Sequence, residues 1–347
     1  QHISALVLAI AGCALIGLFA STGDGLAWPQ ATSPINLAAV LGCVLAVAGA
    51  AAAAVSPGRV ALVATLGASG LGMALFFLAA RAPDVAITQL MVETLTVIFL
   101  ALVLRRLPPT RLVGSRKPAA KRFHAVVAIV IGAVVAAMML TTVSQPLPGD
   151  IARWYLDNSL PGGHGANVVN VILVDFRALD TLGEILVVGL AGLAAAGLLA
   201  GGDPGARTRG ATAGSADFGS VLLRQGILPL SALLALVALM LLWRGHNLPG
   251  GGFIGGLVAA SAAVLVALAF GTTRARARRR VPPLAMLAGG LGVAACAGLV
   301  GLFHGGPFLA GHWIFPAGLA LGTPLLFDLG VFLTVLGAVL HVLLGVL

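Results

Sequence analysis

One carboxylate lies in the middle of an apolar segment that is long enough to cross a membrane. Glu93 falls within Val85–Leu104, about 20 residues that would span a hydrocarbon core of roughly 30 Å at about 1.5 Å per residue. On a helix, Gln89, Glu93 and Thr96 share one face. Because a charge at this depth costs at least about 2.5–3.5 kcal/mol, we expect Glu93 to move a proton or a cation. The alternative is a protonated Glu93 that is hydrogen-bonded to a neighbouring helix.

A second pair of carboxylates, Asp180 and Glu184, lies about one helical turn apart on one face. Two like charges this close favour a site that exchanges a proton for a cation. The hydroxyl of Thr181 offers a further oxygen ligand for a hard cation. Arg177 precedes Asp180 by one turn, and the alternative is an ion pair between these two residues at the end of the helix.

A third unusual stretch, Gly245–Leu257, contains Pro249 followed by consecutive glycines. This run interrupts a helix, so we expect it to pack against another span, with Phe253 beside it. A plain surface turn is the alternative. Asp328 opens the last hydrophobic segment and His341 lies deeper in it. Both residues are candidates for supporting an ion path. The alternative for Asp328 is a charge at a helix N-terminus, and the alternative for His341 is a hydrogen-bond donor packed between helices.

Composition sets the fold class. The chain has 347 residues, of which 59% are hydrophobic and 9% charged, so it is predicted to be an all-α, polytopic transmembrane protein and not a water-soluble enzyme. The basic residues behind its net charge of +9 gather between apolar segments, as expected for the cytoplasmic loops of a membrane protein. The positive charge therefore does not predict a nucleic-acid partner. Cys13, Cys43 and Cys296 show no metal-ligand spacing, so they are interpreted as inert buried thiols, and neither a metal nor a cofactor is expected.

Hydropathy and loop charges together predict about ten spans with both chain ends cytoplasmic, because this count places most of the 20 Lys and Arg residues on one side. The chain begins at Gln1 without an initiator Met, so we expect it to be part of a longer protein. The predicted spans are Ile3–Ala20, Ile35–Val55, Ala61–Ala80, Val85–Leu104, His124–Val143, a sixth ending near Leu199, Gln225–Trp243, Gly252–Gly271, Leu284–Phe303 and Leu325–Leu347.

Several of these stretches resemble components of the Mrp multisubunit cation/proton antiporters. APDVAITQLMVETLTVIFLALVLRRLP (Ala82–Pro108) resembles the C-terminal part of MrpA, and NVVNVILVDFRALDTLGEI (Asn167–Ile185) resembles the next element of MrpA. RGHNLPGGGFIGGL (Arg244–Leu257) and TPLLFDLGVF (Thr323–Phe332) are similar to MrpB. The resemblance covers about Ile35–Leu347. It divides the chain into a leading helix and loop (1–34), an MbhD-like region (35–122), an MbhE-like region (123–200), a linker (201–224) and an MrpB-like region (225–347).

The resemblance implies a sodium or potassium/proton antiporter in a bacterial plasma membrane, assembled with C, D, E, F and G-like subunits and the antiporter-like half of MrpA. It implies transport roles for Glu93, Asp180 and Glu184, and marks Pro249 and Phe253 as MrpB motif residues. Asp84, in the tight corner before the span that holds Glu93, is a further candidate for ion or proton transport. The antiporter-like half of MrpA carries membrane lysines, whereas Lys117 and Lys121, the only lysines here, are predicted to lie in a loop. We therefore expect this chain to lack that half. Two other functions remain open: the membrane arm of a redox-driven pump such as a hydrogenase, and a structural assembly subunit.

Overall fold

The computed structural model describes residues 36–56, 58–106, 118–144, 149–200, 221–270 and 281–346. The chain divides into two compact units, one made of Gln1–Asn36 with Arg111–Ala152 and the other of Leu37–Thr110 with Arg153–Leu347. In the first unit, the long helix is α5 (Pro118–Ser144). The predicted first span, most of the basic connection after α4, all but the last four residues of the predicted linker and the arginine run near residue 276 lie outside the described residues.

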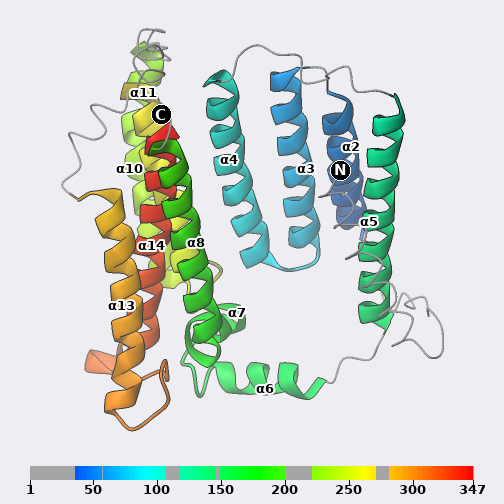
Figure 1. Cartoon of the computed structure of the whole chain (residues 1–347). Coiled ribbons are helices and arrows are strands. Elements are labelled where there is room, and N and C mark those ends of the chain that lie inside the picture. Colours follow the sequence, from blue (N-terminus) through cyan, green and yellow to red (C-terminus); the bar gives the residue numbers. More distant parts are fainter. Residues whose placement is uncertain are drawn as a thin grey trace. The chain divides into compact units, whose positions relative to one another are not determined.

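The second unit begins with three consecutive helices, α2 (Leu37–Val55), α3 (Arg59–Ala79) and α4 (Pro83–Arg106), each packed against the next (Figure 1). Small residues let α2 and α3 approach backbone to backbone. A Cβ atom added at Gly72 would lie 2.4 Å from the backbone nitrogen of Ala46. Close approach of this kind is how membrane helices associate without a hydrophobic driving force between them.

After α6 (Gly149–Ser159), a short α7 (Val168–Val171) and a π-helix, η1 (Ile172–Phe176), lead into α8 (Ala178–Ala200). The remaining long helices are α10 (Val221–Arg244), α11 (Gly252–Phe270), α13 (Pro283–Phe303) and α14 (Thr323–Val346). Helix α14 packs against α8, α11 and α13 and also contacts α4, and its buried Phe327, Val331 and Val335 form the centre of the core. Helix α14 therefore lies among several helices of this unit (Figure 1).

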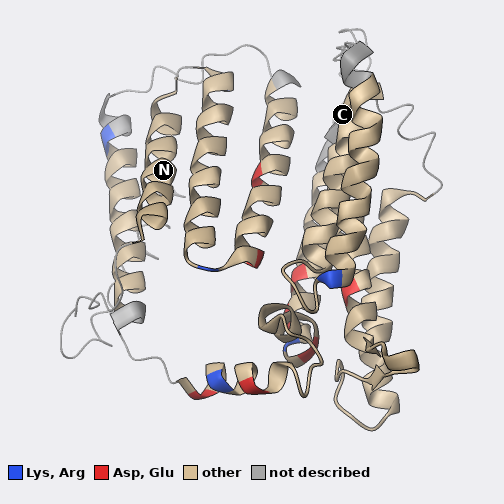
Figure 2. Ribbon diagram, turned by 180° about the vertical axis from the view of Figure 1, so that it is seen from behind, with Lys and Arg blue, Asp and Glu red and all other residues tan. Residues whose placement is uncertain are grey.

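Nine helices of the described residues are long and apolar enough to cross a membrane, in agreement with nine of the ten predicted spans. Long stretches of these helices carry no charged residue (Figure 2). The predicted bounds differ mainly where basic residues flank a span. Helix α4 continues through Arg106, α5 begins at Pro118 and so includes Lys121, and α10 begins at Val221. Lys and Arg are good helix formers whose long side chains reach water from inside a helix, so hydropathy makes these three helices too short.

Two further details differ from expectation. Cys43 and Cys296 were predicted to be buried, but both are exposed on the surface of the chain, because they lie on helix faces that no other part of the described chain covers. The connection between α13 and α14 carries a short antiparallel pair, β1 (Trp313–Ile314) and β2 (Leu321–Gly322), joined through a 3₁₀ turn, η2 (Pro316–Gly318). Cys13 lies outside the described residues.

Candidate functional site: carboxylates at the helix contacts

The side chain of Glu93 lies directly against the backbone of α3. A Cβ atom added at Gly70 would lie 2.0 Å from Oε2 and 2.1 Å from Cδ of Glu93, so the carboxyl group occupies the space that the glycine leaves free. Glu93 is half-buried there, on the side of α4 that packs against α3. Because α4 is continuous, Gln89 and Thr96 share its face as predicted, with Gln89 half-buried and Thr96 exposed. The structure therefore places the Glu93 carboxyl at the contact between α3 and α4.

Asp84, at the start of α4, joins three distant parts of the sequence. Its Oδ1 accepts a hydrogen bond from the backbone N–H of Gly250 at 2.9 Å. The side-chain amide of Asn167 lies 3.4 Å from the same oxygen and also donates to the carbonyls of Gly245 and Leu248, each at 3.1 Å. Asn167 additionally caps α7, because its side chain accepts from the N–H of Asn170. A helix start, a helix cap and the glycine run thus meet at one polar junction.

The backbone N–H groups of the glycine run are all paired with acceptors. Beside the bond from Gly250 to Asp84, Gly251 donates to the carbonyl of Leu241 at 2.9 Å, and Gly252 donates to Oδ1 of Asp328 at 2.7 Å. Gly251 has a φ of 103°, which side-chain-bearing residues rarely adopt. A buried irregular backbone requires this complete pairing, since unpaired amides at membrane depth are costly.

These contacts confirm that the Pro249–Gly252 run interrupts a helix and packs against other spans, and the surface-turn alternative is wrong. Helix α10 ends at Arg244 and α11 begins at Gly252, with Gly250 and Gly251 buried. Phe253 is partly buried and packs against the main hydrophobic core, as predicted. Pro249 is half-buried, and its carbonyl accepts from Nε of Arg244 at 3.1 Å.

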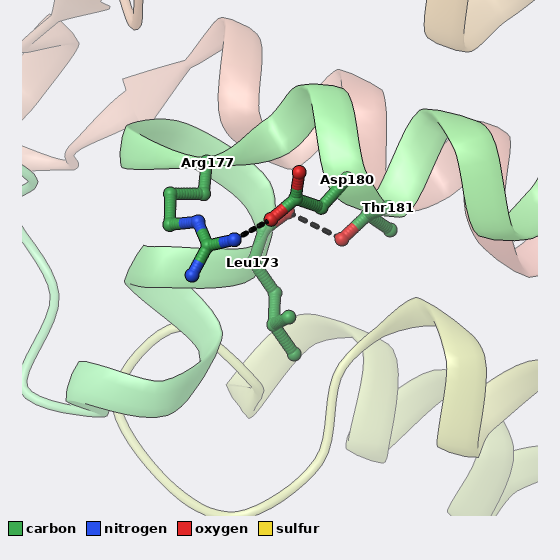
Figure 3. A network of polar contacts seen from close by, with 4 residues as sticks. All are labelled: Leu173, Arg177, Asp180 and Thr181. Atoms are coloured by element: carbon green, nitrogen blue, oxygen red, sulfur yellow. Dashed lines mark hydrogen bonds and ion pairs between the residues drawn. The ribbon is translucent and has the colours of Figure 1, made fainter. Parts of the chain in front are cut away.

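Asp180 forms an ion pair with Arg177 (Figure 3). This pairing is the alternative to a cation site that the sequence left open. Both side chains are about half exposed, at 57% for Arg177 and 49% for Asp180. The hydroxyl of Thr181, predicted to help hold a cation, is buried and instead donates to the carbonyl of Leu173 at 2.7 Å (Figure 3). Glu184 lies one turn further along α8 and is exposed. In this arrangement Arg177 already neutralises one of the two carboxylates.

Asp328 and His341 occupy different levels of α14. Asp328 is 4% exposed and bonds to the first residue of α11, so it caps a neighbouring helix and does not serve as a terminal charge of its own. His341 is half-buried, 13 residues after Asp328 and therefore about 20 Å further along the helix. The two residues thus cannot share one site.

A cluster of aromatic and ionisable side chains that the sequence did not single out lies outside the spans. Asp175, in the π-helix η1, accepts a hydrogen bond from the N–H of Gly311 at 3.1 Å. The ring of Trp313 lies 5.3 Å from that of His164 and 4.9 Å from that of His246. Nε2 of His246 lies 2.6 Å from the carbonyl of Gly163. The feature that points to this cluster is the π-helix, because such turns often mark functional sites. The sequence alone does not reveal it.

Burial perturbs the acid–base behaviour of this cluster. It raises the pKa of Asp175, while the indole of Trp313, the Gly311 N–H and the nearby His164 and His312 act in the opposite direction. Burial lowers the pKa of His246, and the bond to the Gly163 carbonyl partly offsets this effect. Asp175 in η1 and His246 in the connection between α10 and α11 therefore both have pKa values displaced from their ordinary range.

Three family models match successive stretches of the chain between residues 44 and 341. Residues 44–109 match the MbhD family and residues 120–212 match the MbhE family, both described as components of MBH. Residues 222–341 match a domain related to the MnhB subunit of Na⁺/H⁺ antiporter. A protein of Rhizobium meliloti, named as the A/B component of a probable K⁺/H⁺ antiporter, is 33% identical over 83% of this chain. The chain is a homologue of the MrpA and MrpB antiporter subunits.

A solved structure and a second antiporter component are also similar to this chain. The structure of the Mrp complex from Dietzia sp. DQ12-45-1b contains a chain that superposes on all of this one with a TM-score of 0.85 and 36% sequence identity. The A component of the Na⁺/H⁺ antiporter of Alkalihalophilus pseudofirmus is 38% identical over 41% of this chain. This MrpA/MrpB homologue spans 32% of the length of the Rhizobium protein and 38% of the Dietzia chain. The predicted resemblance is thereby confirmed.

Proposed function

We propose that this chain is a membrane subunit of a multisubunit antiporter that exchanges sodium or potassium for protons. The proposal is supported by the relatives named as components of K⁺/H⁺ and Na⁺/H⁺ antiporters and by the likeness to a chain of an Mrp complex. It includes assembly with C, D, E, F and G-like subunits and with the antiporter-like half of MrpA in a bacterial plasma membrane, with both ends of this chain cytoplasmic. The region boundaries near residues 122, 200 and 225 belong to the same proposal.

Within this function, Glu93 carries protons or cations across the contact between α3 and α4. The observation that carries this assignment is the seat of its carboxyl group against Gly70, within a helix long and apolar enough to span a membrane. A carboxylate at this depth costs free energy unless it is neutralised, paired or hydrated, so its presence in this helix favours a transport role. Gln89 and Thr96, on the same face, supply hydrogen-bonding groups along the path. Asp84 lies at the start of the same helix, and its bonds to the glycine run hold this path to the MrpB-like region.

Asp180 and Glu184 belong to the cation side of the path. The ion pair with Arg177 neutralises Asp180, so Glu184 is the carboxylate available to a cation until Arg177 moves. We therefore expect Glu184→Gln and Asp180→Asn each to raise the cation concentration for half-maximal exchange, and Arg177→Ala to change it less. An unchanged cation dependence in both carboxylate variants would leave Asp180 and Glu184 as structural partners of Arg177.

The direct test is cation-dependent proton exchange by the complete complex reconstituted in vesicles. Sodium or potassium added on one side should drive proton movement that is lost when this chain is omitted from the assembly. A second candidate function, the membrane arm of a redox-driven pump, is favoured by the two families named for MBH, which match residues 44–109 and 120–212. Iron–sulfur absorbance in the purified assembly, together with electron-transfer-dependent ion movement, would favour the pump and count against the antiporter.

A further inference from the structure

The carboxyl group of Asp328 is buried with little to stabilise a negative charge. It is 4% exposed, and the N–H of Gly252 at 2.7 Å from Oδ1 is its one hydrogen-bond donor in the described part of the chain. Helices α11 and α13, which pack beside it on α14, contain no Asp, Glu, Lys or Arg. An isolated carboxylate in such surroundings is costly, so this group is expected to bind a proton or a cation.

A second buried polar group faces the same small space. Asn170 is 6% exposed, and its Oδ1 lies 2.7 Å from the position that a Cβ atom would take on Gly251. Oδ2 of Asp328 lies 3.5 Å from that same position. The amide nitrogen of Asn170 has no hydrogen-bond partner among the described residues. One oxygen of each residue therefore lies close to the side of Gly251 that has no side chain, and a proton on either carboxyl oxygen would give the pair the donor that two acceptors lack.

We propose that Asp328 and Asn170 form a proton-binding site distinct from Glu93. The proton binds Oδ2 of Asp328, and the resulting hydroxyl donates to Oδ1 of Asn170 while Oδ1 of Asp328 keeps the bond from Gly252. A proton needs only these two groups. A hard cation needs about six oxygen ligands, whereas the side chains of Asp328 and Asn170 offer three oxygens between them, one of which already accepts from Gly252.

The charged groups on the surrounding elements are each engaged elsewhere. Asp84 of α4 accepts from Gly250, and Nε of Arg244 at the end of α10 donates to the carbonyl of Pro249. Asp175 of η1 accepts from Gly311. On α8, Arg177 pairs with Asp180, which is the one ion pair among the described residues, and Glu184 is exposed. No cation is paired with Asp328 in this part of the chain, so a proton is the available means of neutralising it.

The site joins two regions of the chain. Asn170 lies within the part that matches MbhE, and Asp328 within the part that matches the MnhB-related domain. Uptake of a proton would add a hydrogen bond between them, and its release would leave two facing acceptors. Occupancy of the site therefore changes the contact between these regions at the glycine run.

Infrared difference spectroscopy of the purified complex, titrated with acid, tests the site without requiring transport. The wild-type complex should show the carbonyl band of a protonated carboxyl group that is lost in Asp328→Asn and retained in Glu93→Gln. Asn170→Leu should shift this band to higher wavenumber, because the hydroxyl loses its acceptor. The matched control Asn158→Leu removes an asparagine whose amide bonds only within α6, and it should leave the band in place.

Two results would overturn the proposal. A protonated-carboxyl band that persists unchanged in Asp328→Asn would show that Asp328 remains an anion that only caps α11. A band that does not move in Asn170→Leu would show that Asn170 is not its acceptor. If Asp328→Asn fails to assemble, side-chain ¹³C-labelled aspartate in the wild-type complex assigns the band, and an absence of isotope shift would refute the site. Loss of exchange in Glu93→Gln with this band intact would separate the two carboxylates.

Discussion

Adding one methyl group at Gly70 should displace Glu93 while leaving the rest of the α3–α4 contact nearly unchanged. In Gly70→Ala the new Cβ would lie 2.0 Å from Oε2 and 2.1 Å from Cδ of Glu93. Ordinary contact between such atoms is about 3.5–4.0 Å, so the carboxyl group must move by about 1 Å or more. The group that must move is the far end of a flexible side chain, so we expect the overpacking cost to stay near the lower end of about 1–3 kcal/mol.

The assay is cation-dependent proton exchange in vesicles, with the amount of assembled complex measured in parallel. Displacement of a reacting group by about 1 Å can cost on the order of 100-fold in rate, so Gly70→Ala should lose at least about tenfold in exchange with normal assembly. Gly67→Ala is the matched control, because its Cβ would meet Cγ2 of Val97 at 3.2 Å and not Glu93. Gly72→Ala should instead reduce assembly, since its Cβ would meet the backbone of α2. Wild-type exchange in Gly70→Ala would refute the view that the position of Glu93 against α3 matters.

Two further predictions concern the contacts outside the centre of the span. Asp84→Ala leaves the N–H of Gly250 without its acceptor and should lower the melting temperature of the complex by an amount equivalent to about 1–3 kcal/mol. Asp84→Asn keeps an acceptor oxygen, so it should change the melting temperature little. Equal melting temperatures of the two variants would count against the polar junction at Asp84. Burial lowers the pKa of His246, so the folded state favours the neutral ring and loses stability as the pH falls below the ordinary value of about 6.5. Hydrogen exchange at the Gly163 loop should therefore accelerate on acidification in the wild type and less in His246→Gln, and identical pH profiles would contradict this assignment.

Hydropathy was sufficient to predict the nine membrane-length helices of the described residues, because a span of about 20 apolar residues is a local property of the sequence. The same local reasoning found the interruption at Pro249–Gly252, because proline and glycine break helices. It offered the ion pair of Arg177 with Asp180 only as the alternative to a cation site, although side chains three residues apart on a helix face each other. Glu93 was recognised because a charge inside an apolar segment is conspicuous.

The partners of these groups could not be predicted in the same way. The bond from Gly250 to Asp84 joins residues 166 positions apart, and the bond from Gly252 to Asp328 joins residues 76 apart. Gly70 is one of many glycines in apolar segments, and only the packing of α3 against α4 shows that it faces Glu93. Asn170 likewise resembles any polar residue near a helix start. Tertiary contacts of this kind depend on which helices pack together, which the sequence pattern of a single helix does not encode.

The central claim, that Glu93 is an ion-carrying carboxylate, is tested most directly by Glu93→Gln in the complete complex. Glutamine keeps the shape and hydrogen-bonding ability of the side chain but cannot bind and release a proton in this range. The account predicts that the complex assembles at the wild-type level while cation-dependent proton exchange is abolished. Exchange at the wild-type rate in the assembled Glu93→Gln complex would contradict it and leave Glu93 as a structural hydrogen-bonding residue between α3 and α4.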